Sequence, residues 1–249
     1  MYMKKVLAII PARFASTRFP GKPLADIGGK SMIQRVYEQV LSCSGISQVL
    51  IATDNLLIRQ TAEGFGAKVV MTNENCVSGT DRCAEALLAI GGSWDVVLNV
   101  QGDEPFIRPE QLDELILRMV SPDVQIGTLV SRIKTEADVQ NPNVVKAVLA
   151  QSGKALYFSR SAIPFVRGGK EGEWIHQADF FRHVGLYAFR QNVLEEVAQL
   201  PPGKLELAES LEQLRWLESG FSIYAAETVW ESHGIDTPED LENAMRFLS

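Results

Sequence analysis

Residues 6–24 read VLAIIPARFASTRFPGKPL, an apolar run followed by a loop that carries three cations. The apolar run has the length and branching of a buried parallel strand, and Pro11, which lacks an N–H, is expected to end its ladder. Arg13, Arg18 and Lys22 follow among hydroxyl and glycine residues. Ligands of open α/β sheets bind at the carboxyl ends of strands, so the loop predicts a polyphosphate site, with a solvated basic loop as the plainer alternative.

The alternation of strand and helix continues through the first half of the chain. Strand-like runs at 46–53, 68–72 and 95–100 are each followed by a helix-like segment. This order is typical of βαβ units. We therefore predict an α/β fold with a mostly parallel central sheet flanked by helices.

The pattern changes after residue 121, where short strand-like runs predict an antiparallel elaboration. Expected strands lie at 125–133, 144–150, 154–160, 182–190 and 222–228, expected helices at 191–199, at 205–218 and from Pro238, and a Gly-rich, mobile surface loop at 165–180. We treat 1–249 as one domain with a nucleotide-binding part at about 1–120, a sugar-binding and dimerisation part at about 121–228, and a C-terminal part at about 229–249.

Composition narrows the class of protein. The formal net charge of −7 argues against nucleic acid as the main partner. No run approaches the roughly 20 apolar residues of a membrane span, and no signal-peptide pattern begins the chain, so we expect a cytoplasmic protein. Three cysteines without CxxC spacing predict reduced, largely buried thiols rather than a disulfide framework or zinc site: Cys43, Cys76 and Cys83.

Asp103 is the first candidate for chemistry. It follows the strand at 95–100, next to Gln101 and Gly102, where the edge of the sheet opens. Magnesium takes one or two protein carboxylates and completes its shell with phosphates and water. Asp103 is therefore a candidate Mg²⁺ ligand.

Asp236 is the second candidate, in the segment Gly234-Ile235-Asp236-Thr237-Pro238-Glu239-Asp240. An Asp or Thr before Pro-Glu is also a common helix N-cap. From the spacing alone, capping by Thr237 or Asp236 is favoured over metal binding.

Polar residues of the second half could line a further pocket. Arg160 ends the strand at 154–160 and could clamp a carboxylate or be a paired surface arginine. His183 and Tyr187 share one strand face, although an isolated His is more often a satisfied core residue. On the helix expected at 205–218, Glu209 and Gln213 are four apart and would share a face, and an adjoining leucine stripe with Trp216 could form a dimer seam.

The basic loop and a series of later motifs resemble CMP-sugar synthetases, and their detail favours the 3-deoxy-manno-octulosonate (Kdo) cytidylyltransferase family. The resemblance covers the whole chain. Its motifs after the loop are Ala52-Thr53-Asp54, Met71-Thr72, Ser78-Gly79-Thr80-Asp81-Arg82, residues 99–105, Asn141-Pro142-Asn143-Val144-Val145-Lys146, residues 155–160, residues 183–187, residues 211–215 and residues 235–240.

The resemblance implies a Rossmann-like nucleotidyltransferase fold, a homodimer, and a Mg²⁺-dependent reaction in which CTP and Kdo give CMP-Kdo and diphosphate for lipopolysaccharide biosynthesis. It implies three groups of site residues. These are a nucleotide group of Pro11, Ala12, Arg13, Arg18, Lys22, Ser78, Gly79, Arg82, Gln101 and Gly102; a metal pair of Asp103 and Asp236; and a sugar group of Gln101, Arg160, His183, Tyr187, Glu209 and Gln213. By the same resemblance, Arg13, Arg18, Lys22 and Asp103 would carry catalysis.

Three alternatives stay open. The same reaction could use an 8-amino form of Kdo, with the 165–180 loop tuning the choice. A sialic-acid cytidylyltransferase shares the loop but is disfavoured by the segments at 156–160 and 212–215. A nucleotide-binding module without catalysis would be expected to lack Arg18, Lys22 or Asp103, and all three are present.

Overall fold

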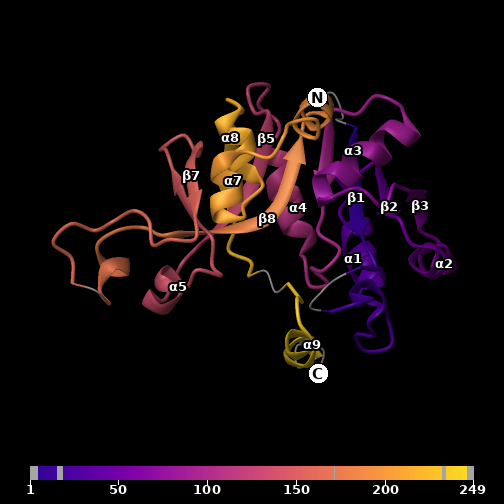
Figure 1. Ribbon diagram of the computed structural model, residues 1–249, viewed down its shortest axis with the longest axis horizontal. Coiled ribbons are helices and arrows are strands. Elements are labelled where there is room, and N and C mark those ends of the chain that lie inside the picture. The colour runs from indigo at the N-terminus through magenta and orange to yellow at the C-terminus, as the bar shows by residue number, and fades with distance from the viewer. Residues whose placement is uncertain (1–4, 16–18, 171, 232–233, 246–249) are drawn as a thin grey trace. The chain divides into compact units, whose positions relative to one another are not determined.

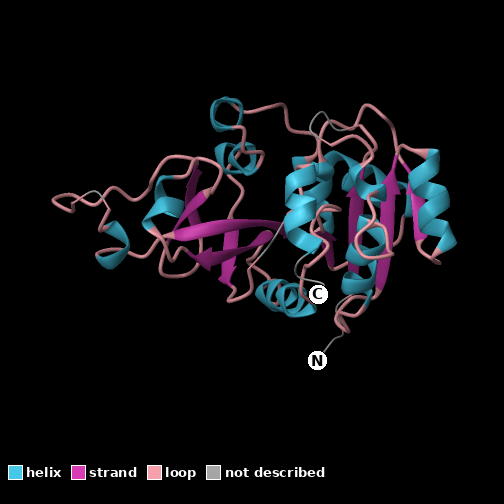
Figure 2. Cartoon of the chain, turned by 90° about the horizontal axis from the view of Figure 1, so that it is seen from below, coloured by secondary structure: helices cyan, strands magenta, loops and turns pink. Residues whose placement is uncertain are grey.

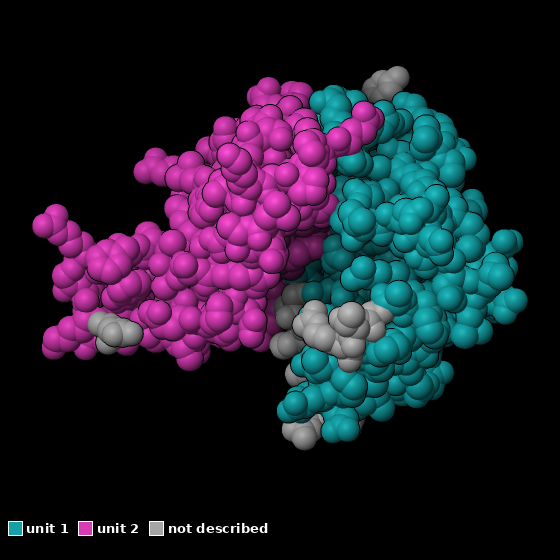
Figure 3. Space-filling view, in the orientation of Figure 1, with its two compact units in different colours: residues 1–113, 188–198, 232–249 teal, residues 114–187, 199–231 magenta. Residues whose placement is uncertain are grey.

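The computed structural model describes residues 5–15, 19–170, 172–231 and 234–245. The chain forms two compact units (Figure 3). Unit 1 comprises residues 1–113, 188–198 and 232–249, and unit 2 comprises residues 114–187 and 199–231. The N-terminal loop and the C-terminal Asp236 segment therefore belong to the same unit, although they lie at opposite ends of the sequence.

Unit 1 contains four parallel strands in the order β3-β2-β1-β4, of which Figure 1 labels the first three. Their bounds are Val6–Ala12 for β1, Gln48–Thr53 for β2, Lys68–Met71 for β3 and Val96–Asn99 for β4. The βαβ prediction is confirmed. Pro11 does not end the strand, because β1 pairs with β2 through Ala12 and Thr53; only the ladder to β4 stops earlier, at Ile9 and Asn99.

Helices flank these parallel strands (Figure 2). They are α1 (Met32–Leu41), α2 (Leu56–Gly64), α3 (Gly79–Ile90), the first half of α4 (Pro109–Arg118), α6 (Gln191–Val197), α9 (Pro238–Met245) and the 3₁₀ turn η1 (Lys22–Leu24). Asn55 caps α2 by accepting from the backbone of Leu57 and Ile58. The helices α1, α2, α3 and α6 pack on the strands and fix the strand ends that carry the site, whereas α9 packs against Ile27 and Met32.

The antiparallel elaboration that the sequence predicts is confirmed in part in unit 2. Its strands are β5 (Ile126–Arg132), β6 (Lys146–Leu149), β7 (Ala155–Ser159), β8 (Phe181–Phe189, whose last two residues belong to unit 1) and β9 (Ile223–Glu227). β5 and β9 pair in parallel, whereas β6 pairs antiparallel with both β7 and β8. A short helix that the sequence did not suggest, α5 (Glu136–Gln140), precedes β6.

The helix expected at 205–218 is two helices, α7 (Lys204–Glu209) and α8 (Gln213–Glu218). Ser210 breaks it, with a left-handed φ of 52° that no α-helix accommodates. The prediction that Glu209 and Gln213 share a helical face is therefore wrong. The side chain of Arg215 joins the two helices by donating to Glu206 at 2.6 and 2.7 Å.

Two further predictions about unit 2 need correction. Trp216 is 0% exposed and packs on Tyr187, so it is not available for a dimer seam. The 165–180 segment is only partly a surface loop, because it contains the 3₁₀ turn η2 (Trp174–His176). There Trp174 packs against the cluster around Phe180. Within the described ranges, every helix is too short or too polar to cross a membrane.

Candidate functional site

A pocket of about 280 Å³ opens in unit 1 at the carboxyl ends of β1 and β4. The two strands are parallel neighbours, so the loops that follow them meet at one edge of the sheet. The pocket is lined by Pro11, Ala12, Arg13, Lys22, Pro23, Cys76, Val77, Ser78, Gly79, Arg82, Gln101, Gly102, Asp103 and Asp236. Every described residue predicted for the nucleotide or the metal is in this lining; Arg18 lies outside the described residues.

Glycines allow the backbone to close around this pocket. A Cβ on Gly102 would lie 2.8 Å from the carbonyl oxygen of Pro11, so the loop after β4 can approach β1 only with glycine at this position. Gly21 has a left-handed φ of 70°, and its N–H donates to the carbonyl of Phe14 at 3.0 Å. This turn places Lys22 at the start of η1, facing the pocket.

Lys22 lies between the two predicted metal ligands. Its Nζ is 2.7 Å from Oδ2 of Asp103 and 3.0 Å from Oδ1 of Asp236. Burial disfavours the charged ammonium, but attraction to the two carboxylates outweighs burial and raises the pKa of Lys22 above its ordinary 10.5. The structure thus brings together three charges that are 81 and 214 residues apart in sequence.

The sequence left two roles open for Asp236, a helix cap or a site residue, and the contacts of Thr237 and Asp240 show which residue caps the helix. Thr237 caps α9, because its Oγ1 accepts from the N–H of Asp240 at 3.2 Å and the Asp240 carboxylate accepts from the N–H of Thr237 at 2.8 Å. The Asp236 side chain instead reaches Lys22. The N–H of Ile235 also donates to the carbonyl of Asp103 at 2.9 Å, which ties this segment to the loop after β4.

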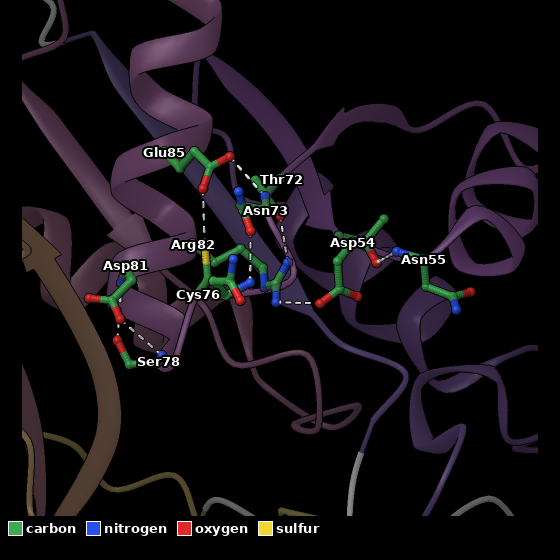
Figure 4. Close-up of polar contacts among 11 residues, drawn as sticks. Asp54, Asn55, Thr72, Asn73, Cys76, Ser78, Asp81, Arg82 and Glu85 are labelled. Atoms are coloured by element: carbon green, nitrogen blue, oxygen red, sulfur yellow. Dashed lines mark hydrogen bonds and ion pairs between the residues drawn. The ribbon is translucent and has the colours of Figure 1, made fainter.

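One wall of the pocket is the N-terminus of α3. Ser78 and Asp81 form a reciprocal capping box there. Arg82, one turn further on, is 2% exposed and donates to Thr72 at 2.5 Å and to Asp54 at 2.7 Å (Figure 4). The Arg82 guanidinium is therefore committed to protein partners that tie α3 to the ends of β2 and β3.

Glu85 is a contributor to this wall that the sequence did not suggest. One carboxylate oxygen accepts from the N–H of Asn73 at 2.8 Å, and the other accepts from Sγ of Cys76 at 3.1 Å (Figure 4). Burial, with the hydrogen bond to Glu85, raises the pKa of Cys76 to about 12, so this half-buried free cysteine stays protonated near neutral pH. The carboxylate therefore fixes the segment that leads from β3 to the pocket.

In unit 2 the predicted sugar residues Arg160 and Glu209 lie together. The Glu209 carboxylate accepts from Oγ of Ser159 at 2.6 Å and from the backbone N–H of Arg160 at 2.9 Å. The Arg160 guanidinium donates to the carbonyls of Glu209, Pro142 and Ser210 at 2.7, 3.1 and 3.4 Å. The neutral carbonyls hold the guanidinium in place without cancelling its charge.

His183 and Tyr187 also lie together, with ring centroids 5.3 Å apart. Burial lowers the pKa of His183 to about 3, so the ring is neutral near pH 7. Oγ1 of Thr128 lies 2.9 Å from the carbonyl of Leu186 and 3.0 Å from Nε2 of His183. Because the hydroxyl has one proton to donate to the carbonyl, we assign the imidazole proton to Nε2, which leaves Nδ1 as an acceptor.

Gln213 begins α8 and is 4% exposed. Its buried amide nitrogen has no hydrogen-bond partner among the described residues. A buried donor without a partner costs roughly 1–3 kcal/mol, so such groups are typical of sites that a ligand completes. Of the sugar group, Gln101 alone lies in unit 1, where it lines the pocket.

Lys146 is a second residue that sequence reasoning missed, although its motif was quoted. It is fully buried at the start of β6, and its Nζ donates to the carbonyls of Asn141, Val144 and Arg160 at 2.9, 2.7 and 2.5 Å. The sequence could not predict these hydrogen bonds, because all three acceptors are backbone carbonyls, which every residue has.

A family profile described as cytidylyltransferase matches residues 7–231. The chain belongs to the cytidylyltransferase family. It is thus an enzyme of the nucleotidyltransferase class, as the motifs predicted.

Relatives of this cytidylyltransferase carry a more specific name. A protein of Parabacteroides distasonis named 3-deoxy-manno-octulosonate cytidylyltransferase is 52% identical over 251 residues and covers 99% of each chain. One of the same name from Porphyromonas gingivalis is 50% identical, covering 98% of this chain and 96% of the relative. The predicted Kdo cytidylyltransferase family is confirmed.

Solved structures agree with the predicted fold. A CMP:2-keto-3-deoxy-manno-octonic acid synthetase complexed with CTP has a TM-score of 0.91 at 41% identity, covering 98% of both chains. A 4-diphosphocytidyl-2C-methyl-D-erythritol synthase from Anaerococcus prevotii has a TM-score of 0.62 at 15% identity, with 98% of both chains covered, and shares the fold alone. The mixed α/β nucleotidyltransferase fold is confirmed.

Proposed function

We propose that this chain transfers the cytidylyl group of CTP to the anomeric hydroxyl of Kdo, giving CMP-Kdo and diphosphate for lipopolysaccharide biosynthesis. The observation that carries the proposal is the convergence of Asp103 and Asp236 on the ammonium of Lys22, in a pocket at the edge of the sheet. Relatives named for this reaction match over nearly the whole chain, which supports the choice of substrates.

The pocket of unit 1 is the proposed nucleotide site. Pro11, Ala12, Ser78 and Gly79 would border the cytosine and ribose, and Arg82, Gln101 and Gly102 would complete the wall. Arg13, Arg18 and Lys22 would bind the triphosphate, because guanidinium and ammonium groups form charge-assisted hydrogen bonds to phosphate oxygens. Binding CTP would give Lys22 a new anionic partner in addition to its two carboxylates.

Asp103 and Asp236 are the proposed Mg²⁺ ligands. The two carboxylates already share one cation within 3.0 Å, and two carboxylates beside a phosphate site are the donors that magnesium prefers. Bound Mg²⁺ supplies neutralisation of phosphate charge and polarisation of the attacking hydroxyl. The role of the carboxylates is to hold the cation, while Lys22, Arg13 and Arg18 orient the phosphates and stabilise the departing diphosphate.

The residues of unit 2 are the proposed sugar-acid site. Arg160 would pair with the carboxylate of Kdo, since its guanidinium is oriented by three backbone carbonyls rather than by a direct ion pair with a carboxylate. Nδ1 of His183 would accept from a sugar hydroxyl, and the amide of Gln213 would donate to one. Glu209 and Tyr187 would complete the site. No covalent enzyme intermediate is needed, because the hydroxyl attacks the α-phosphorus directly.

Diphosphate release from CTP and Mg²⁺ tests the proposal with Kdo, its 8-amino analogue and N-acetylneuraminate as parallel acceptors. We expect Kdo to give the highest kcat/KM. Preference for the amino sugar would move specificity toward that analogue, and preference for N-acetylneuraminate would make the chain a sialic-acid enzyme. No diphosphate release with any of the three acceptors, in a protein that still binds CTP, would contradict catalysis and favour a nucleotide-binding module.

We also propose that the enzyme acts as a homodimer in the cytoplasm. The family resemblance supports both statements. Exposed apolar side chains of unit 2, Leu156 at 57% and Leu207 at 69%, are candidates for the interface, whereas buried Trp216 is not. Light scattering at micromolar concentration should give twice the chain mass of 27.5 kDa, and a monomer would contradict the dimer.

A further inference from the structure

The ammonium of Lys146 occupies a cage of backbone carbonyls. Its side chain is 0% exposed, and its three N–H donors match three carbonyl oxygens, of Asn141, Val144 and Arg160, at 2.9, 2.7 and 2.5 Å. All donors of the ammonium are therefore satisfied within one turn and one strand end. The cage closes the chain from residue 141 to residue 144 onto the end of β7.

The same turn receives the guanidinium of Arg160. Nη1 of Arg160 donates to the carbonyl of Pro142, which lies between the two turn residues that Lys146 binds. Lys146 also holds the backbone carbonyl of Arg160 itself. Lys146 thus fixes both the main chain of Arg160 and the turn against which its guanidinium rests.

A buried ammonium is costly to keep, and this one lies near another cation. Burial lowers the pKa of Lys146 below 10.5; Glu209 opposes this effect and Arg160 adds to it. A hydrophobic side chain of similar length would fill the same space without the desolvation of a charge. A purely structural role in packing therefore does not explain an ammonium at this position, whereas orientation of the three carbonyls does.

We propose that Lys146 is a positioning residue for sugar-acid binding, which sets the direction of the Arg160 guanidinium through the 141–144 turn and the Arg160 carbonyl. The inference rests on the proposed function, since it takes Arg160 to bind the acidic sugar. Lys146 does not touch the sugar. Its loss should therefore weaken the use of Kdo without weakening the use of CTP.

The test is a KM split combined with a double-mutant cycle. We expect Lys146→Met to raise the KM for Kdo roughly tenfold and leave the KM for CTP within about twofold. Lys146→Gln, which keeps two N–H donors, should give a smaller rise and serves where the Met variant folds poorly. In the Arg160→Ala background, Lys146→Met should add no further rise. Exposed Lys204→Met is the control and should change neither KM.

The outcomes separate this inference from the proposed function. If the wild type turns over Kdo while Lys146→Met and Lys146→Gln leave its KM unchanged, or raise both KM values together, the positioning role is overturned and the function stands. If the wild type releases no diphosphate with Kdo, the proposed function is wrong. The double-mutant cycle of Lys146→Met and Arg160→Ala is then measured as free energies of unfolding in urea. Non-additive losses of stability would then support the Lys146–Arg160 linkage, and additive losses would overturn it.

Discussion

Lys22 in unit 1 is partly buried and Lys146 in unit 2 is fully buried, and the two ammonium groups are bound in opposite ways. Lys22 pairs with two carboxylates, which raise its pKa despite burial. Lys146 donates to three neutral carbonyls, and burial lowers its pKa. The partners of Lys22 are carboxylates that can also bind a metal ion, whereas those of Lys146 are part of the main chain.

This difference separates two ways of placing positive charge. In unit 1 two carboxylates hold one ammonium, so a metal ion could bind the carboxylates while Lys22 contacts a phosphate. In unit 2 the Arg160 guanidinium is held by three backbone carbonyls, and the Glu209 carboxylate accepts from the backbone N–H of the same residue. The first arrangement suits a polyphosphate with its cation, and the second suits a single carboxylate.

The largest effect is expected from removing the Asp103 carboxylate, which contacts Lys22 in unit 1. Asp103→Asn removes a carboxylate that contacts Lys22, and diphosphate release should fall by roughly 10³-fold or more at saturating Mg²⁺. The unfolding midpoint should change little, because the side chain buries little apolar surface. Exposed Asp123→Asn is the matched control and should keep wild-type turnover. Normal activity of Asp103→Asn would remove Asp103 from the metal site.

In unit 2, Gln213→Leu should weaken the binding of Kdo without lowering the stability of the fold. The variant loses the buried amide nitrogen that has no partner among the described residues, so stability should stay equal or rise by about 1 kcal/mol. The KM for Kdo should rise roughly tenfold. Gln111→Leu provides the contrast: Gln111 is equally buried, but its side chain accepts from the N–H of Arg108 at 3.0 Å, so this variant should be less stable. A destabilised Gln213→Leu with normal KM would show that the amide is structural.

The third prediction concerns His183 of unit 2 and the pH dependence of the free energy of unfolding. Its folded pKa of about 3 lies below the ordinary 6.5, so between these values the unfolded chain takes up a proton that the folded chain does not. The free energy of unfolding should therefore fall as pH drops from 6.5 toward 3. His183→Gln removes this loss, and urea unfolding at pH 7.5 and 5.0 should show a flatter dependence than in the wild type. Parallel pH dependence in the two proteins would contradict a neutral, partly buried His183.

The smallest effect is expected at Glu85, which shapes the pocket wall from outside. Glu85→Gln keeps an oxygen and the side-chain length but removes the negative charge that accepts from Asn73 and Cys76. The KM for CTP should rise about threefold, with the KM for Kdo unchanged. The control is Glu63→Gln, at an exposed side chain of α2. A rise in the KM for Kdo alone would disconnect Glu85 from the nucleotide pocket.

Much of the fold is predictable because its signals are local. Apolar runs bounded by turn residues locate β1, β2 and β4, and Asn55 marks the start of α2. The break between α7 and α8 could not be predicted in this way. It depends on a left-handed Ser210, a conformation that serine rarely adopts and that the leucine spacing around it does not signal.

The site residues likewise differ in how far the sequence could place them. Asp103 could be placed from the strand before it, because parallel strands end at one edge of the sheet. Asp236 could not, since Thr237-Pro238 suits a helix cap equally well and only the fold shows that Thr237 takes that part. Lys146 gave no signal at all, because its partners are carbonyls that every residue has.

The division of labour between the two regions is tested most directly by measuring both KM values for Lys22→Met and Arg160→Ala side by side. We predict that Lys22→Met raises the KM for CTP roughly a hundredfold and leaves that for Kdo within about twofold, and that Arg160→Ala does the reverse. If both substitutions raise the same KM, or each raises the two equally, unit 1 and unit 2 do not bind separate substrates and the account is wrong.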